Sequence, residues 1–478
     1  MTYLPSYSGS TRRPSGPIPP LCSRARERAL CTPSGVRVTF LILITIITLL
    51  CGIGSSFAQQ GVRPPQAPAT PRDDVEVGAR ALLRTELALG PLLVRPQIGG
   101  AAGWRSVAER YRIGDPTEIE TDFTIDVSPE IQAALPMRTN HILRFGARLD
   151  YNWFARRKAL RKLDVIVPAS YEYSSERTLL TVANLFVDGS QDFLDPVTFE
   201  DEVVLPEYEL DYRHSFRSNS SSAAFEFDLT RTIMLGVSAS QRIVRYDELE
   251  DVLSVENAIR RNRDDHALGA SIGFRLIPST TLFLTYAWAD SIPEFAESIR
   301  EREQDRFGVS LASSPSRRFV TNVSVGYKRL LYTHSEADDV EGVTGNALVS
   351  TVLGDRVVVD LTGERDLYPS YWRDNLYFDR YGGGAAITLA VTRAVRLGAG
   401  GGYHIHEYPN ETIETLPTGA QSVVSRVDEL WEYLGFFQWT LGSTHSIGAR
   451  AGWTERASNF DEYNREGLIL GAGYSIVY

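Results

Sequence analysis

Cysteine is scarce in this chain and confined to one end of it. The only three cysteines in 478 residues are Cys22, Cys31 and Cys51. If the chain is cleaved after Ala58, the mature protein has none, which excludes a disulfide framework, thiol catalysis and a cysteine zinc site.

Methionine is equally rare, with 3 residues, against 38 Gly, 22 Tyr and 20 Phe. This composition favours an antiparallel β protein with aromatic girdles over a helical one.

An excess of positive charge is also missing. Six of the 49 basic residues and one of the 60 acidic residues precede position 59, which leaves 43 basic against 59 acidic side chains in the mature chain. Because proteins neutralise nucleic-acid phosphates with lysine and arginine, this balance argues against a nucleic-acid partner.

Long hydrophobic runs are limited to Val38–Leu50, which reads VTFLILITIITLL. The run follows an arginine-rich stretch and precedes Ser56-Phe57-Ala58, a small-x-small cleavage pattern. It is shorter than the about 20 residues that a spanning helix needs, so we predict a cleaved signal peptide with a long n-region, residues 1–58, in preference to a membrane anchor. The proline-rich stretch that follows predicts a periplasmic tether, residues 59–89, which leaves residues 90–478 for the main domain.

Within residues 90–478, apolar and polar residues alternate with a period of two. Phe145, Leu149 and Trp153 fall on one face of a predicted strand, while Arg148 and Asp150 fall on the other. The same pattern recurs near residues 282–288, 319–327 and 357–364. A soluble β-sandwich alternates in the same way, so alternation alone does not separate it from a membrane barrel.

The lengths of the connections do separate these two folds, because outer-membrane barrels alternate tight periplasmic turns with longer outer loops. Short turns are predicted near residues 136–138, 230–231, 277–279, 314–316, 354–355, 392–393 and 442–443. Longer polar segments are predicted at residues 247–264, 291–303, 333–341, 367–374, 408–425 and 457–463. The alternation gives twelve strands from Thr232 onward. Six more strands precede them, with Val203–Phe216 and Ser222–Leu229 read as one bent strand or two.

The predicted fold is therefore all-β, a transmembrane antiparallel up-and-down β-barrel of about 18 strands. A count of 16 also satisfies the even number that returns both ends to the periplasm. The predicted location is the bacterial outer membrane, with its lipid as the first partner.

The last strand, GLILGAGYSIVY, places Leu470, Ala472, Tyr474, Ile476 and Tyr478 on one face and ends on an aromatic residue. This resembles the C-terminal insertion signal of bacterial outer-membrane proteins, and it implies recognition by the barrel-insertion machinery. The sequence departs from that pattern at Ile476, where an aromatic residue is common.

Most of the mature chain also resembles the putative β-barrel porin type 2 family. The resemblance is carried by the early pair RPQIGGAAGW and DFTIDVSPEIQAALP, by the strand HILRFGARLDYNWF, and by the turns in LIPSTTLFLTY and SSPSRRFVTNVSVGY. It implies a porin-like barrel, and in some members an association with exopolysaccharide export, which would add a periplasmic export partner.

The predicted inward positions carry charges of both signs, which either set the selectivity of a pore or neutralise one another in a filled barrel. They are Arg144, Arg148, Asp150, Glu226, Asp228, Arg242, Arg275, Asp360, Glu364, Arg396, His404, His406, Glu432 and Arg450. His404 and His406 share a strand face, but a structural zinc site needs four ligands, so we interpret them as solvated lumen histidines and expect no metal or cofactor. We predict that Arg144→Glu or Arg148→Glu changes ion preference without unfolding the barrel.

These features predict a passive porin-like channel, or an export conduit for small solutes or polysaccharide, rather than an enzyme. Residues 408–425 and 188–201 are candidates for a constriction. One alternative is a plugged structural or adhesive barrel. A hydrolase is the other, although Ser240 and His266, on neighbouring strands, have no G-x-S-x-G elbow beside them.

Overall fold

The computed structural model describes residues 87–108, 119–191, 198–199, 202–203, 214–247, 262–294, 301–333, 339–370, 375–415, 421–460 and 463–477. The chain divides into two units, Met1–Thr45 and Ile46–Tyr478, and everything described belongs to the second. The predicted signal peptide, the tether up to residue 86 and Tyr478 lie outside the described residues. Within those residues, no helix is both long and apolar enough to cross a membrane.

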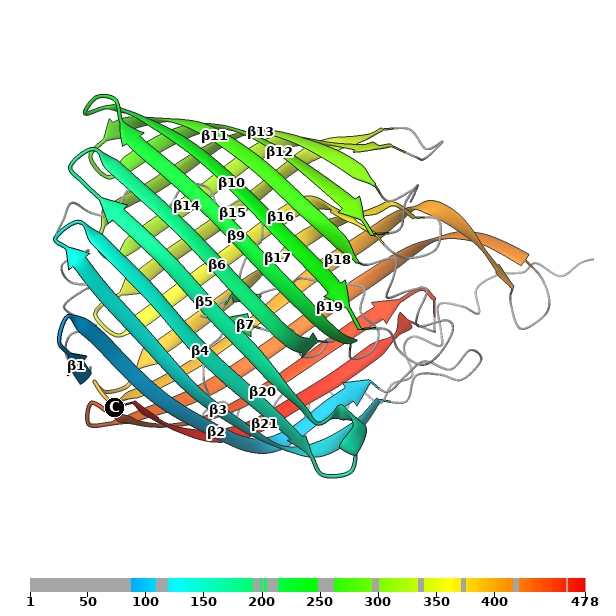
Figure 1. Cartoon of the computed structure of the whole chain (residues 1–478). Helices are drawn as coiled ribbons and strands as arrows, with labels where there is room; N and C mark the ends of the chain where they lie inside the picture. Colours follow the sequence, from blue (N-terminus) through cyan, green and yellow to red (C-terminus); the bar gives the residue numbers. More distant parts are fainter. Residues whose placement is uncertain are drawn as a thin grey trace, which may run out of the picture. The chain divides into compact units, whose positions relative to one another are not determined.

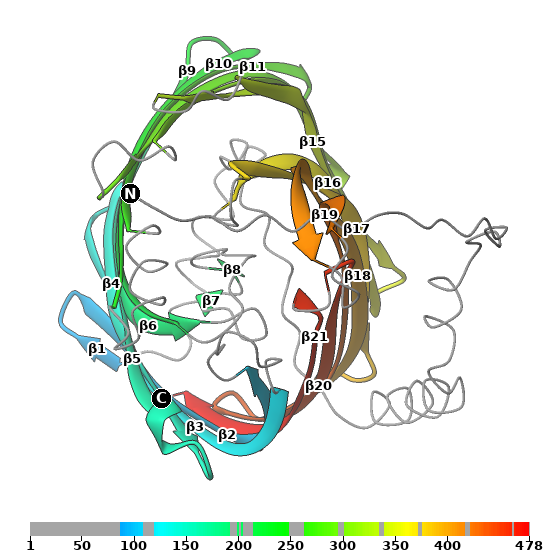
Figure 2. The same ribbon diagram turned by 90° about the vertical axis from the view of Figure 1, so that its right-hand side faces the viewer.

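Eighteen antiparallel strands form one continuous sheet that closes on itself (Figures 1 and 2). The strands are β2 Leu92–Ala108, β3 Ile119–Arg138, β4 His141–Phe154, β5 Lys162–Ser174, β6 Thr178–Gln191, β9 His214–Asp228, β10 Ile233–Tyr246, β11 Arg263–Ile277, β12 Thr280–Pro293, β13 Arg302–Ser316, β14 Phe319–Tyr332, β15 Val340–Leu353, β16 Val357–Pro369, β17 Tyr377–Ala390, β18 Val395–Thr415, β19 Gln421–Leu441, β20 His445–Ser458 and β21 Arg465–Val477. The predicted all-β barrel of 18 strands is confirmed, with six strands before Thr232 and twelve after it.

Short pieces complete the described chain. Strand β1, Leu87–Leu89, pairs with the start of β2 and occupies the last three residues of the segment predicted as tether. Strands β7, Thr198–Phe199, and β8, Glu202–Val203, pair only with each other. In the view along the barrel this hairpin lies within the ring of strands (Figure 2). One 3-10 helix, η2, covers Lys158–Leu160 between β4 and β5.

The barrel closes where its first long strand meets its last. Strand β2 pairs with β21 from Gln97 opposite Val477 to Arg105 opposite Ile469. On one face of this seam Leu470, Ala472, Tyr474 and Ile476 lie opposite Trp104, Ala102, Gly100 and Ile98. The C-terminal pattern therefore belongs to β21, the last strand of the seam. Its recognition by the barrel-insertion machinery stays a prediction.

Tight turns gather at one end of the barrel and the longer connections at the other (Figure 1). Gly354 and Gly442 lie in two of the tight turns with positive φ angles, 63° and 69°, which a glycine adopts without strain. The start of β2 and the end of β21 lie at this same end, as an even number of strands requires.

Two predicted loops are shorter than expected because the strands beside them are longer. Residues 408–425 were predicted as one connection, but β18 continues to Thr415 and β19 begins at Gln421. Pairing resumes after a register shift between Glu407 and Glu411, which absorbs Pro409. The constriction predicted at 408–425 is therefore largely a continuation of the β18–β19 hairpin. Similarly, β6 runs through Asp188 to Gln191, and Ser222 belongs to a single strand that begins at His214.

The seam gives the first testable prediction. Gly103 on β2 has no room for a side chain, because an added Cβ would overlap the backbone of Leu470 and Gly471. Gly99 lies on the same face of the same strand, and a Cβ there would make ordinary contacts, the nearest at 3.9 Å. We expect Gly103→Ala to lower the free energy of unfolding by about 1–3 kcal/mol, as overpacking does elsewhere, and Gly99→Ala to leave it nearly unchanged.

Urea unfolding followed by heat-modifiable gel mobility measures this difference. Equal midpoints for the two variants would contradict the close approach of β2 and β21.

Candidate functional site

The two faces of the sheet differ in chemistry. One row of register partners crosses β10 to β15 through Val237, Ala270, Tyr286, Phe307, Tyr327 and Val343. Its large side chains are exposed, for example Val237 by 56% and Phe307 by 57%. A soluble sandwich would bury such a row, whereas a barrel in lipid turns it outward. Closure of the sheet also gives the backbone N–H and C=O groups at its edges hydrogen-bond partners, which hydrocarbon cannot supply.

The chain is a bacterial outer-membrane β-barrel. Its apolar face is turned outward, and its other face lines the lumen.

The residues predicted to point inward lie on the strand face opposite the exposed apolar columns. In β4, for instance, Phe145 and Leu149 are exposed by 44% and 38% on the outer face, and Arg144, Arg148 and Asp150 alternate with them. By the same register, the remaining predicted positions alternate with outward residues in β9, β10, β11, β16, β18, β19 and β20. Their use as a selectivity lining stays a prediction.

Many of these charges are paired on the inner wall. Arg148 contacts Asp150 at 2.8 Å, and Arg275 contacts Asp228 at 2.7 Å. Arg144 contacts Glu172 at 2.8 Å, a partner that strand periodicity alone does not reveal because it comes from the adjacent strand. Local neutralisation of charge therefore dominates this part of the wall.

A buried cluster of charges lines the inner face of β13 to β18. Lys328 Nζ donates to Asp366 Oδ1 at 3.0 Å and to the Leu367 carbonyl, while Arg306 reaches the other Asp366 oxygen at 3.4 Å. Beside it, Arg380 contacts Glu364 at 3.0 Å. These side chains are each less than a fifth exposed. Arg306, Lys328, Asp366 and Arg380 are absent from the predicted set.

The two histidines belong to this same wall. His404 Nδ1 lies 3.5 Å from Glu364, and His406 is fully buried against the ring of Phe378, with centroids 4.7 Å apart. They are thus packed, rather than solvated as the sequence suggested. Across the described ranges, no group of three or more His, Cys, Asp or Glu side chains is placed to hold a metal ion.

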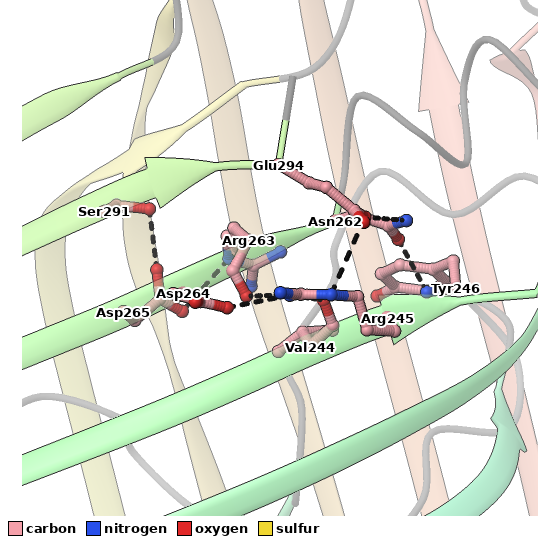
Figure 3. A network of polar contacts seen from close by, with 9 residues as sticks. All are labelled: Val244, Arg245, Tyr246, Asn262, Arg263, Asp264, Asp265, Ser291 and Glu294. Atoms are coloured by element: carbon pink, nitrogen blue, oxygen red, sulfur yellow. Dashed lines mark hydrogen bonds and ion pairs between the residues drawn. The ribbon is translucent and has the colours of Figure 1, made fainter. Parts of the chain in front are cut away.

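A polar recess of about 390 Å³ lies in the inner wall at the long-loop end of β9 to β13. Its inward polar side chains are Ser220, Ser222, Ser240, Arg242, Arg263, Asp265, Ser291, Arg302 and Gln304. Figure 3 shows its edge, where Ser291 donates to Asp265 and Arg263 faces the same carboxylate. Of the three arginines in this recess, the sequence predicted only Arg242 as inward, because Arg263 and Arg302 were assigned to the connections 247–264 and 291–303.

A second recess, about 130 Å³, adjoins the first toward the turn end of β9 to β13 and continues onto β14 and β15. Small and neutral inward residues dominate its lining, among them Gly236, Ser238, Gly269, Ser271, Thr285, Gly308, Ser310, Ser324 and Gly326. The two recesses occupy successive inward positions of β9 to β13, so together they form a polar track along one side of the lumen.

The pair considered for a hydrolase does not converge. Ser240 is the register partner of Ala267, while His266 is the partner of Gln241. Adjacent positions of a strand point to opposite faces, so Ser240 faces the lumen and His266 the exterior.

Comparison with solved structures finds other outer-membrane proteins. The chain is similar to OpdK from Pseudomonas aeruginosa, with a TM-score of 0.45 and 9% identity over 80% of this chain and 99% of that one. It is similar to OccAB3 from Acinetobacter baumannii, with a TM-score of 0.44 and 11% identity over 80% and 99%. It is also similar to a bacterial polysaccharide outer-membrane secretin, with a TM-score of 0.33 and 9% identity over 80% of this chain and 97% of that one.

These likenesses carry no assignment of substrate at such identities and scores. No protein-family model matches the chain, and no curated protein matches its sequence. The similarity to the putative β-barrel porin type 2 family therefore stays a resemblance.

The buried charge cluster gives the second prediction. Asp366→Asn removes the anion between Lys328 and Arg306 and leaves two buried cations without compensation. Breaking such a buried arrangement costs about 3–5 kcal/mol, so we expect a clear loss of stability in urea. The matched control is Asp355→Asn, because Asp355 pairs with Arg318 at 2.6 Å but is 84% exposed. Pairs of that kind contribute about 0–1 kcal/mol.

Comparable unfolding midpoints for the two aspartate variants would show that Asp366 is solvated rather than buried in the wall.

Proposed function

We propose that this barrel is a passive channel of the outer membrane that conducts small polar solutes through its lumen. The observation that carries the proposal is the polar track on β9 to β13, where two adjoining recesses are lined mainly by serine, glycine and charged or amide side chains. A barrel of this strand number is wide enough for an aqueous lumen unless chain segments fill it.

The small side chains of the 130 Å³ recess leave space at the wall, and the charged side chains of the 390 Å³ recess add fixed charge beside it. A solute that passes along the track exchanges its water for hydroxyl and guanidinium groups, so the passage of polar molecules is favoured over that of apolar ones. No step in this account requires an energy source in the barrel itself.

Single-channel recording tests the proposal. Protein extracted from membranes and reconstituted in planar bilayers should give stable stepwise currents, with heat-modifiable gel mobility as the check that the barrel is folded. A folded barrel that stays silent in the bilayer would contradict an open channel.

A second candidate, an export conduit narrowed or plugged at its outer end, is favoured by one feature of the inner wall. Ile166, Val187, Phe216, Val244 and Tyr246 form an apolar cluster on inward positions of β5 to β10 and are 3% exposed or less. Apolar side chains on a lumen face narrow the wet cross-section. Such a conduit would act with a periplasmic partner and would pass polysaccharide or other polymer only when opened.

Ion preference gives the third prediction. Because Arg144 pairs with Glu172, Arg144→Glu converts a neutral pair into two facing carboxylates. We expect the reversal potential in a KCl gradient to move toward cation selectivity, with single-channel currents retained. Arg318→Glu is the control, since Arg318 lies 60% exposed at a tight turn rather than on the lumen wall.

If wild-type protein and folded Arg144→Glu have the same reversal potential, permeating ions do not pass close to this part of the wall, and the prediction is contradicted.

A further inference from the structure

We infer that the connection between β4 and β5 is a binding site for the phosphorylated headgroups of lipids in the outer leaflet of the membrane. The site lies on the outer surface of the barrel, so it does not depend on the channel function proposed above. Three features carry it: a short basic segment, the buried anchor of its backbone, and an arginine held against an outward-facing tryptophan.

The connection and the first residue of β5 are strongly basic. Residues 155–162 read ARRKALRK, with five basic side chains and no acidic one. In the chain as a whole, acidic residues outnumber basic ones. The segment is therefore a local basic run in an acidic protein, and lysine and arginine form charge-assisted hydrogen bonds to phosphate groups.

Two of the five cations are engaged or buried within the barrel wall. Lys162 Nζ lies 3.3 Å from Asp188, and Arg157 is only 8% exposed. The other three are exposed or half-buried and form no ion pair with any residue in the described ranges. These three, which supply the positive charge of the site, are Arg156, Lys158 and Arg161.

The backbone of the connection is fixed to the neighbouring strand β3. The Asp122 carboxylate, 2% exposed, accepts the backbone N–H of Arg156 at 3.1 Å and that of Arg157 at 3.0 Å. The Ala155 N–H donates to the Phe123 carbonyl at 2.9 Å. A short connection that is anchored in this way keeps its cations at the rim of the wall, and it loses little conformational entropy when a ligand binds.

Arg161 shows that the connection serves the outer surface. Its guanidinium carbon lies 4.7 Å from the centre of the Trp153 ring, and its Nε donates to the Phe154 carbonyl at 2.9 Å. Trp153 shares the outward face of β4 with Leu149 and Tyr151, which are exposed by 38% and 41%. The Arg161 guanidinium is therefore held beside the lipid-facing side of the wall, away from the lumen.

Outward aromatic residues place this arginine at the edge of the membrane. Trp104 on β2 packs edge-to-face against Phe123 on β3, with ring centres 5.4 Å apart, and Trp153 is the register partner of Ile125 on β3. Tryptophan is enriched where the hydrocarbon meets the headgroups. Strand β4 begins at a tight turn, so Trp153 lies toward the end with the longer connections, which faces the exterior in such barrels (Figure 1). The cations beyond Trp153 therefore reach the headgroup level of the outer leaflet.

Other strands carry acidic residues toward the same end of their outward face. Glu303 on β13, Glu429 on β19 and Glu466 on β21 are exposed there. Carboxylates repel phosphates, so a phosphorylated headgroup is favoured at the β4–β5 connection over these parts of the rim. The ring of Trp153 beside three cations also suits a ligand with an apolar part next to its phosphates, which is the chemistry of a lipid and not of a polysaccharide.

Diphosphoryl lipid A is the probe for this site. In native mass spectrometry of the detergent-solubilised full-length barrel, we expect the wild-type protein to retain it at lower concentrations than phosphatidylcholine, which has no net charge. The triple variant Arg156→Gln, Lys158→Gln, Arg161→Gln should weaken this binding about a hundredfold, because each cation near an anionic headgroup contributes about fivefold. Heat-modifiable gel mobility checks that each variant is folded.

The matched control removes three exposed cations from tight turns at the opposite end, by Arg231→Gln, Arg317→Gln and Arg393→Gln. Equal lipid A binding by the two triple variants would overturn the site. If the first triple variant does not fold, Lys158→Gln alone should weaken binding about fivefold, and binding equal to that of Arg317→Gln would overturn the site.

Two further outcomes test the class of ligand. Equal retention of lipid A and phosphatidylcholine by the wild-type protein would overturn the recognition of phosphate. Binding of polygalacturonate, an acidic polysaccharide, at lower concentrations than lipid A would overturn the assignment to lipid. No current is measured in these experiments, so a barrel that fails to conduct can still bind lipid A, and a conducting barrel can fail to bind it.

Discussion

Backbone hydrogen bonding in hydrocarbon is the constraint on which this structure depends. A strand edge left open in lipid would expose N–H and C=O groups at a cost of several kcal/mol each, so the sheet has to close. Closure requires β2 to meet β21, which explains the approach at Gly103 and the apolar column of the last strand. It also fixes an even number of strands and turns the exposed apolar rows toward lipid.

Within that closed wall the inner face is divided by chemistry. The strands from β13 to β18 carry buried, mutually compensated charges around Asp366 and Glu364. The strands from β9 to β13 carry mostly small residues and, near the long-loop end, serine hydroxyls beside Arg242, Arg263, Arg302 and Asp265. Paired charges stiffen a wall, whereas a hydroxyl-rich wall offers hydrogen bonds to a polar solute. The two halves of the inner wall therefore differ in chemistry, and under the proposed function the solute passes along the polar track.

The sequence was sufficient for the fold because a period of two and the alternation of short and long connections are local signals. Strand count, chain direction and the inward set in β4 all follow from them. The ion pairs could not be predicted in this way. Glu172 becomes the partner of Arg144, and Arg380 the partner of Glu364, only through the register between neighbouring strands. Arg263 and Arg302 were missed because they begin strands beside polar connections, where alternation has too few residues to be read. The β18–β19 hairpin was shortened in the prediction because Pro409 resembles a loop signal, although a register shift accommodates it.

The seam is the central claim, and an engineered disulfide tests it most directly. A Cβ on Gly99 would lie 3.9 Å from Ser475 Cβ, within the 3.5–4.5 Å typical of disulfides. The described residues contain no cysteine that could compete. In the folded barrel, Gly99→Cys with Ser475→Cys should oxidise to a nearly circular chain with altered mobility in a denaturing gel. Ser446→Cys with Ser475→Cys, across the neighbouring β20–β21 pair, is the positive control. If the control pair oxidises while the seam pair stays reduced, β2 and β21 are not joined and the closed barrel is contradicted.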